Sequence, residues 1–138
     1  MTESGVAQIT GRLVVILTVT DLLRSEAWYQ ELFGMEAFRY VRPDEQVGQV
    51  SLREPVSGLE LCLVSHRSSD AEPFDEKRTG LDHVEFVVSG RTDLDEWVIR
   101  LNELGIDHSG VKQPSYTANA MVTFRDPDNI QLEFFWVA

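Results

Sequence analysis

The chain repeats one order of elements twice, and this repeat limits the possible folds more than any other feature. Hydrophobic periodicity predicts a strand, a helix and then three strands in each half. These elements are expected at residues 12–20, 22–33, 38–42, 47–53 and 59–64, and again at 80–88, 93–104, 106–109, 120–125 and 130–137. An offset of 69 residues places Trp97 of the second helix on Trp28 of the first. We therefore expect an α+β fold of two pseudo-symmetric βαβββ modules, neither of which buries its sheet alone.

The two modules are expected to form a single domain. The chain has 138 residues, which is an ordinary length for one domain with its own core. Within residues 1–138, module 1 covers about 12–64 and module 2 about 80–137. The segment 65–79 between them is polar and contains a proline, so we interpret it as the connector.

The ends of both predicted helices carry residues that can start or stop a helix. Asp21 and Thr92 have side chains that can accept a hydrogen bond from the first turn, so each is a candidate N-cap. Gly34 and Gly105 follow the last apolar positions, and glycine ends helices readily because it adopts a left-handed conformation.

The composition excludes several classes of partner. The formal net charge of −11 argues against nucleic acid or an anionic membrane as the main partner. The sequence has no long apolar run, so no transmembrane helix is expected, and no signal peptide is recognisable. Cys62 is the single cysteine, which rules out an internal disulfide and fits a reducing compartment. We therefore expect a cytoplasmic protein that binds a small molecule.

Three ionisable residues stand inside predicted strands. His83 alternates with apolar residues, and Glu60 and Glu133 each have apolar neighbours on both sides. A glutamate in such a strand is costly unless it is paired or binds a metal. The pattern Leu-Glu-Leu around Glu60 resembles Leu-Glu-Phe around Glu133. We therefore predict that these three side chains converge in one cavity between the modules.

Such a group of side chains is suited to a metal. Imidazole and carboxylate ligands bind divalent Zn, Ni, Mn, Co or Fe. The alternative is that His83 is a structural residue, held by hydrogen bonds to its polar neighbours. The offset of 69 residues places Val14 at the position that matches His83, and valine cannot ligate a metal. Any metal at this site is therefore expected to be weakly held.

Four further residues are candidates for the wall of the cavity. Val14 and Arg12 share strand parity, so they point to the same face. Cys62 shares a face with the glutamate two residues before it, although a small buried residue is the simpler interpretation. Tyr116 lies in a predicted loop, and loops at the mouth of a sheet often carry specificity.

Three stretches of the sequence resemble the vicinal oxygen chelate superfamily. They are LTVTDLLRSEAWYQELFGME, GLDHVEF and FRDPDNIQLEF, and the resemblance extends over about residues 12–137. The superfamily includes glyoxalase I, extradiol dioxygenases, methylmalonyl-CoA epimerase, and the fosfomycin and bleomycin resistance proteins. The resemblance implies paired βαβββ modules whose sheets curl around a shared cavity, and a homodimer. It also implies metal ligands at His83, Glu133 and Glu60.

The chain departs from this resemblance at Val14, where metal-using members usually have a histidine. Two functions therefore stay open. The first is an enzyme, such as a metal-dependent lyase, isomerase or dioxygenase, that acts on a small oxygenated substrate, with Glu60 or Glu133 as ligand or base. The second is a non-catalytic protein of the bleomycin-resistance type, which sequesters a small molecule and has a degenerate metal site.

Overall fold

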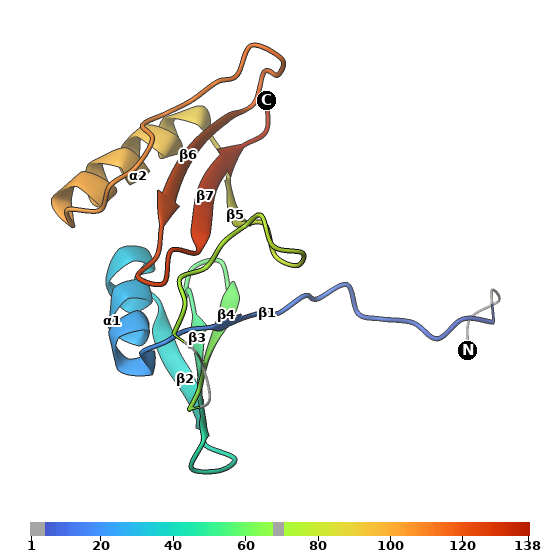
Figure 1. Ribbon diagram of the computed structural model, residues 1–138. Coiled ribbons are helices and arrows are strands. Elements are labelled where there is room, and N and C mark those ends of the chain that lie inside the picture. Colours follow the sequence, from blue (N-terminus) through green and yellow to red (C-terminus); the bar gives the residue numbers. More distant parts are fainter. Residues whose placement is uncertain (1–4, 68–70) are drawn as a thin grey trace.

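The computed structural model describes residues 5–67 and 71–138, and in these residues it has two helices and two β-sheets (Figure 1). The elements, in chain order, are β1 (Val15–Thr18), α1 (Leu22–Phe33), β2 (Glu36–Val41), β3 (Val47–Arg53), β4 (Glu60–His66), β5 (Val84–Val88), α2 (Arg91–Glu103), β6 (Ala120–Arg125) and β7 (Gln131–Trp136). The order confirms an α+β fold with two related modules. Neither α1, with 12 residues, nor α2, with 13, could span a membrane.

Both sheets follow the same pairing scheme. The first sheet has the order β1-β4-β3-β2, and the second has the order β5-β7-β6. In each sheet the first strand of the module pairs in parallel with the last, and the other pairs are antiparallel. The two sheets are separate and are not closed into one barrel. Each has one face against its helix and one open face (Figure 1).

The predicted helix ends are mostly confirmed. The side chain of Asp21 accepts a hydrogen bond from the backbone N–H of Arg24 at 3.1 Å, and Gly34 ends α1 with a left-handed φ of 69°. The prediction for Thr92 is wrong, because α2 begins at Arg91 and Gly90 occupies the N-cap position. Gly90 has no side chain, and the carboxylate of Asp93 accepts its N–H at 2.8 Å instead.

One predicted strand is absent from the second sheet as described. The segment expected at 106–109 makes only one isolated bridge, His108 with Phe124, and a second bridge follows it, Lys112 with Met121. Gly110 between them has a left-handed φ of 69°, which interrupts extended pairing. By contrast, β4 continues to His66, two residues beyond its expected end.

The two modules share one hydrophobic core, as the repeat predicts. Four aromatic side chains join them. Phe33 of α1 lies against Phe86 of β5, with ring centroids 4.6 Å apart, and also contacts Trp97 and Phe134. Trp97 of α2 stacks on Phe134 of β7 at 4.2 Å. Such contacts bury large apolar area with specific ring geometry, so they hold the modules together.

Two carboxylates in the turn between β6 and β7 also bind the first module. The carboxylate of Asp126 accepts hydrogen bonds from the Tyr29 hydroxyl at 2.8 Å and from the N–H groups of Asp128 and Ile130. The carboxylate of Asp128 accepts the N–H and the hydroxyl of Thr20, just before α1. Both aspartates are buried. The sequence indicated a turn here, and the structure adds that this turn connects the modules.

We expect Asp126→Ala to lower the free energy of unfolding by about 3 kcal/mol, because it leaves buried donors without an acceptor. Asp126→Asn should lower it less, since the amide oxygen still accepts hydrogen bonds. Urea unfolding at pH 7 measures both variants. A loss in Asp126→Ala below about 0.5 kcal/mol would show that the turn is not a structural link.

The free energy of unfolding of wild type should depend on pH in a way that differs from that of Asp126→Asn. Burial raises the pKa of Asp126 above its usual range, so the folded state binds the proton more tightly than the unfolded state. The pKa of Asp126 is therefore higher in the folded state than in the unfolded state. As the pH rises through the interval between these two pKa values, wild type loses stability relative to Asp126→Asn. Urea unfolding from pH 3 to pH 7 measures this difference, and an opposite slope would contradict it.

A second stability prediction concerns Ser25 of α1. Its hydroxyl is buried and has no hydrogen-bond partner among the described residues. We expect Ser25→Ala to raise the free energy of unfolding by about 1 kcal/mol, because alanine removes the unpaired hydroxyl and favours the helix. Thermal and urea unfolding of the two proteins measure this change. A destabilised variant would mean that the hydroxyl makes a favourable contact.

Candidate metal centre

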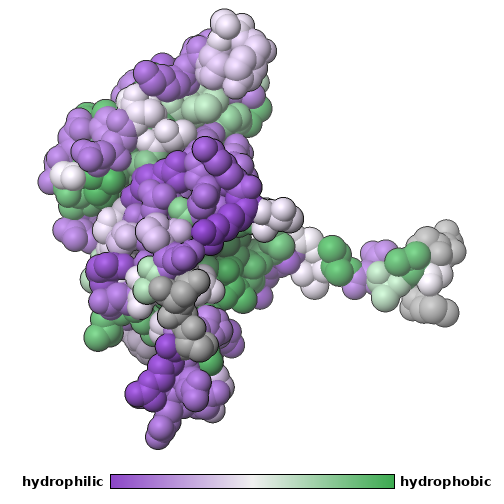
Figure 2. All heavy atoms as spheres, viewed as in Figure 1, coloured by the Kyte–Doolittle hydropathy of each residue, from purple (hydrophilic) through white to green (hydrophobic). Residues whose placement is uncertain are grey.

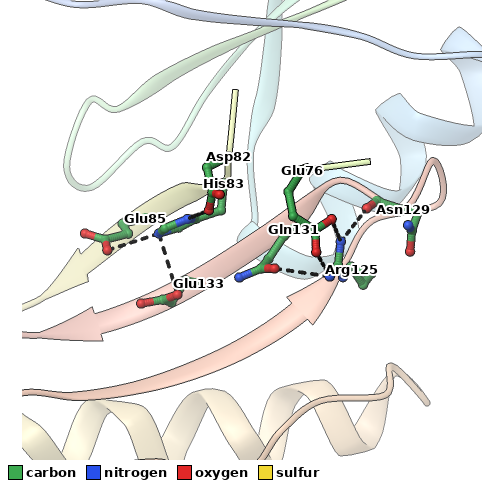
Figure 3. A network of polar contacts seen from close by, with 8 residues as sticks. All are labelled: Glu76, Asp82, His83, Glu85, Arg125, Asn129, Gln131 and Glu133. Atoms are coloured by element: carbon green, nitrogen blue, oxygen red, sulfur yellow. Dashed lines mark hydrogen bonds and ion pairs between the residues drawn. The ribbon is translucent and has the colours of Figure 1, made fainter. Parts of the chain in front are cut away.

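Three potential metal ligands meet on the open face of the second sheet (Figure 3). β5 and β7 pair in parallel with Glu85 directly beside Glu133, so these two side chains share a face. His83 stands two residues before Glu85, just before β5 begins, and points to the same side. His83 and Glu133 therefore lie together, as the sequence predicts.

The distances in this group are short. The Nε2 atom of His83 lies 3.2 Å from Oε1 of Glu85 and 3.7 Å from Oε2 of Glu133. One ligand atom from each of the three residues lies within 4.8 Å of the others. A single ion could therefore contact all three after small side-chain adjustments.

The surroundings of Glu133 are unusual for a carboxylate. Its side chain is only 6% exposed. Its carboxylate accepts no hydrogen bond from the described residues, and the nearest basic atom is Nε2 of His83 at 3.7 Å. Burial raises the pKa of Glu133, because the ionised form loses solvation. A positive charge at this position would offset that loss.

Asp82 fixes the histidine from the other side. Its Oδ1 atom lies 2.6 Å from Nδ1 of His83, and this hydrogen bond is the main cause that raises the pKa of His83. In the neutral imidazole, a hydrogen on Nδ1 leaves the lone pair of Nε2 directed toward the two glutamates. Histidine ligands of metals usually donate their other N–H to a carboxylate in this way. The imidazole and the two carboxylates thus fit a divalent Zn, Mn, Fe, Co or Ni ion.

Glu60 does not belong to this group of ligand atoms. Its carboxylate forms ion pairs with Arg12 and with Arg53, the latter at 3.1 Å. The Arg53 hydrogen bond is the largest of the effects that lower the pKa of Glu60. Glu60 and Arg53 are direct neighbours in the register of β3 and β4. The sequence pattern predicted that this glutamate is either paired or bound to a metal, and in the structure it is paired with two arginines.

Strand register explains why the two glutamates differ. Val15 pairs with Leu61 in the first sheet, and Val84, which matches Val15 by the 69-residue offset, pairs with Leu132 in the second. The residue after Leu61 is Cys62, and the residue after Leu132 is Glu133. Cys62, rather than Glu60, therefore occupies the position in module 1 that Glu133 occupies in module 2.

The remaining predicted cavity residues are spread over the first module and the loop. Cys62 is buried at 3% exposure, and its Sγ lies 3.2 Å from the Ser51 hydroxyl. Val14 is half-buried just before β1, and Tyr116 is 86% exposed. Sequence reasoning did not assign Glu85 as a ligand. Its parity with His83 was the available signal.

Comparison with known proteins agrees with the fold. The family model of the glyoxalase/bleomycin resistance protein/dioxygenase superfamily matches residues 8–134. The chain therefore belongs to this superfamily, as the resemblance of its motifs implied. A search of curated protein sequences finds no match.

Several solved structures share the fold. A glyoxylase/bleomycin resistance protein/dioxygenase domain from Frankia sp. EAN1pec has 32% identity and a TM-score of 0.84, over 95% of this chain and 100% of that chain. A glyoxalase family protein from Enterococcus faecalis has 24% identity and a TM-score of 0.71, over 93% and 97%. The fosfomycin resistance protein FosX from Listeria monocytogenes has 20% identity and a TM-score of 0.69, over 95% and 96%. The last two similarities show the fold alone.

Proposed function

We propose that the protein is a metal-dependent enzyme of this superfamily that acts on a small oxygenated substrate. Its metal ligands would be His83, Glu85 and Glu133. The observation that carries this proposal is the buried carboxylate of Glu133, which lacks a close hydrogen-bond donor and faces an imidazole whose other nitrogen is fixed by Asp82. The ion pairs of Glu60 favour Glu85 as the third ligand.

Each side chain has a distinct part in this proposal. A bound divalent cation would polarise a carbonyl or enolate oxygen of the substrate as a Lewis acid. Asp82 holds the imidazole of His83 in one orientation. Glu85 is 41% exposed, so it is the carboxylate of the group that a substrate can best approach, and it is the candidate general base. A FosX variant complexed with Mn(II) and 1S,2S-dihydroxypropylphosphonic acid makes Mn(II) a suitable first test ion.

The second candidate function is sequestration of a small molecule without catalysis. Two observations favour it. Val14 cannot ligate a metal, and the described ligand group contains one histidine rather than two. In this case Asp82 and the two glutamates would hold His83 by hydrogen bonds and charge, and the open face would bind the ligand directly.

The open faces of both sheets also favour a homodimer. Ile16 of β1 is 58% exposed and Val87 of β5 is 66% exposed. Both point away from the helix of their module. Figure 2 shows a hydrophobic area on the body where the N-terminal arm joins it. A second copy that covered these faces would bury this area and enclose the ligand group.

The metal proposal is tested with His83→Gln. We expect wild type to bind Mn(II), and the variant to bind it at least about tenfold more weakly, because glutamine is a poor substitute for an imidazole ligand. Calorimetric titration of chelator-free protein measures both. His66→Gln is the control, since His66 lies outside the ligand group. A wild type that binds no Mn(II), Zn(II), Ni(II), Co(II) or Fe(II) would overturn the proposal and favour sequestration.

The dimer proposal is tested with Val14→His. If a second copy brings position 14 to the ligand group, the added imidazole should strengthen Mn(II) binding by roughly tenfold. Leu23→His is the control, because Leu23 is 78% exposed on α1, away from the ligand group. Light scattering gives the mass of each protein. A monomeric wild type, or equal Mn(II) affinity in the two variants, would contradict the arrangement.

A further inference from the structure

Arg125 lies on the same open face as the ligand group (Figure 3). It is the last residue of β6 and pairs with Gln131 of β7, whereas Thr123 pairs with Glu133. Arg125 is therefore displaced from the row of Glu133 by two residues along the strands. That step is about 7 Å in a β-sheet. A small ligand bound at the metal centre could reach it.

The guanidinium group of Arg125 donates four hydrogen bonds, and its main partner comes from outside the sheet. Its two terminal nitrogens donate to the two carboxylate oxygens of Glu76 at 3.0 and 2.9 Å. It also donates to the side chain of Gln131 and to the carbonyl oxygen of Asn129, both at 3.1 Å. Glu76 belongs to the segment between the modules. The hydrogen bonds from Arg125 lower the pKa of Glu76 to about 2, so Glu76 is ionised at neutral pH.

Arg125 is a cation on a face that is otherwise rich in acidic side chains. Asp82, Glu85 and Glu133 all lie nearby, and the whole chain carries a formal charge of −11. An anionic ligand would be repelled by such a surface. The guanidinium fork is the group that matches a carboxylate with two parallel hydrogen bonds. Glu76 shows that a carboxylate fits it.

We propose that Arg125 recognises a carboxylate group of the ligand, and that Glu76 is an internal carboxylate which the ligand displaces. This inference rests on the proposed function, because it assigns a substrate class to the same site. The ligand would carry an oxygen that reaches the metal centre and a carboxylate a few bonds away.

Displacement of Glu76 is energetically accessible. The side chains of Arg125 and Glu76 are 39% and 28% exposed, so water already reaches the pair. Exposed ion pairs contribute little to stability, and exchange of one carboxylate for another keeps the same hydrogen bonds. The other interpretation is that the pair only fastens the segment between the modules to the sheet. The two interpretations predict different effects of Glu76 variants on anion binding.

The experiment compares glutarate with butyrate, which lacks the second carboxylate, on Mn(II)-loaded protein by calorimetry. Arg125→Gln should weaken glutarate binding at least tenfold, and by a larger factor than it weakens butyrate binding. Arg125→Lys, which keeps the charge but loses the fork, should give an intermediate loss. Glu76→Gln should strengthen glutarate binding several-fold, because it removes the competing charge. Arg91→Gln on α2 changes the net charge equally and should have no effect.

Unchanged glutarate binding in both Arg125 variants, or no binding of glutarate by any of the proteins, would overturn the assignment. Weaker glutarate binding in Glu76→Gln would also overturn it. The ion pair of Arg125 and Glu76 would then have only the structural role of holding the segment between the modules on the sheet. Thermal unfolding of each variant shows that it is folded. Mn(II) titration without the acids tests the metal separately. If Mn(II) does not bind, the proposed function fails, and glutarate binding to the metal-free proteins still decides the role of Arg125.

Discussion

The placement of the second sheet depends on two buried carboxylates in the turn between β6 and β7. Asp126 and Asp128 connect this turn to Tyr29 and Thr20 in the first module. Burial of a carboxylate is unfavourable unless its oxygens are satisfied, so this turn has few alternative conformations. β7 begins directly after it, and Glu133 follows at its third residue. The position of the ligand group is thereby tied to the packing of the two modules.

The fold is duplicated, but the chemistry of the two open faces is not. By register, the positions of His83, Glu85 and Glu133 in module 2 correspond to Val14, Ile16 and Cys62 in module 1. Both modules have an arginine at one matching position. Arg53 lies two residues after the partner of Cys62, and Arg125 lies two residues after the partner of Glu133. In module 1 Glu60 of the same sheet satisfies the arginine, and Phe38 lies 4.1 Å from its guanidinium carbon. In module 2 the carboxylate comes from outside the sheet. At the positions of the ligand group, the first face has Val14, Ile16 and Cys62, whereas the second face is ionisable.

The sequence predicted the fold well because its signals were local. Alternation and helical periodicity located nine of the ten expected elements, and the strand expected at 106–109 failed because Gly105 and Gly110 both have left-handed backbone conformations. Thr92 failed as a cap since Asp93 reaches the first N–H instead. The site was harder. The parity of Glu85 with His83 was present in the sequence but was not used to assign a ligand. The partner of Glu60 depends on strand register, which the sequence pattern around this glutamate does not contain.

Cys62 gives the first sheet a built-in reporter of its own opening. Its thiol is almost fully buried in β4, a strand that is paired on both sides, and it shares a hydrogen bond with Ser51. A thiol reagent can react with it only when the groups that cover it move aside, so the labelling rate measures the population of that opened state. Because the chain has no other cysteine, the signal has one origin. The same burial protects the thiol from oxidation while the sheet stays intact.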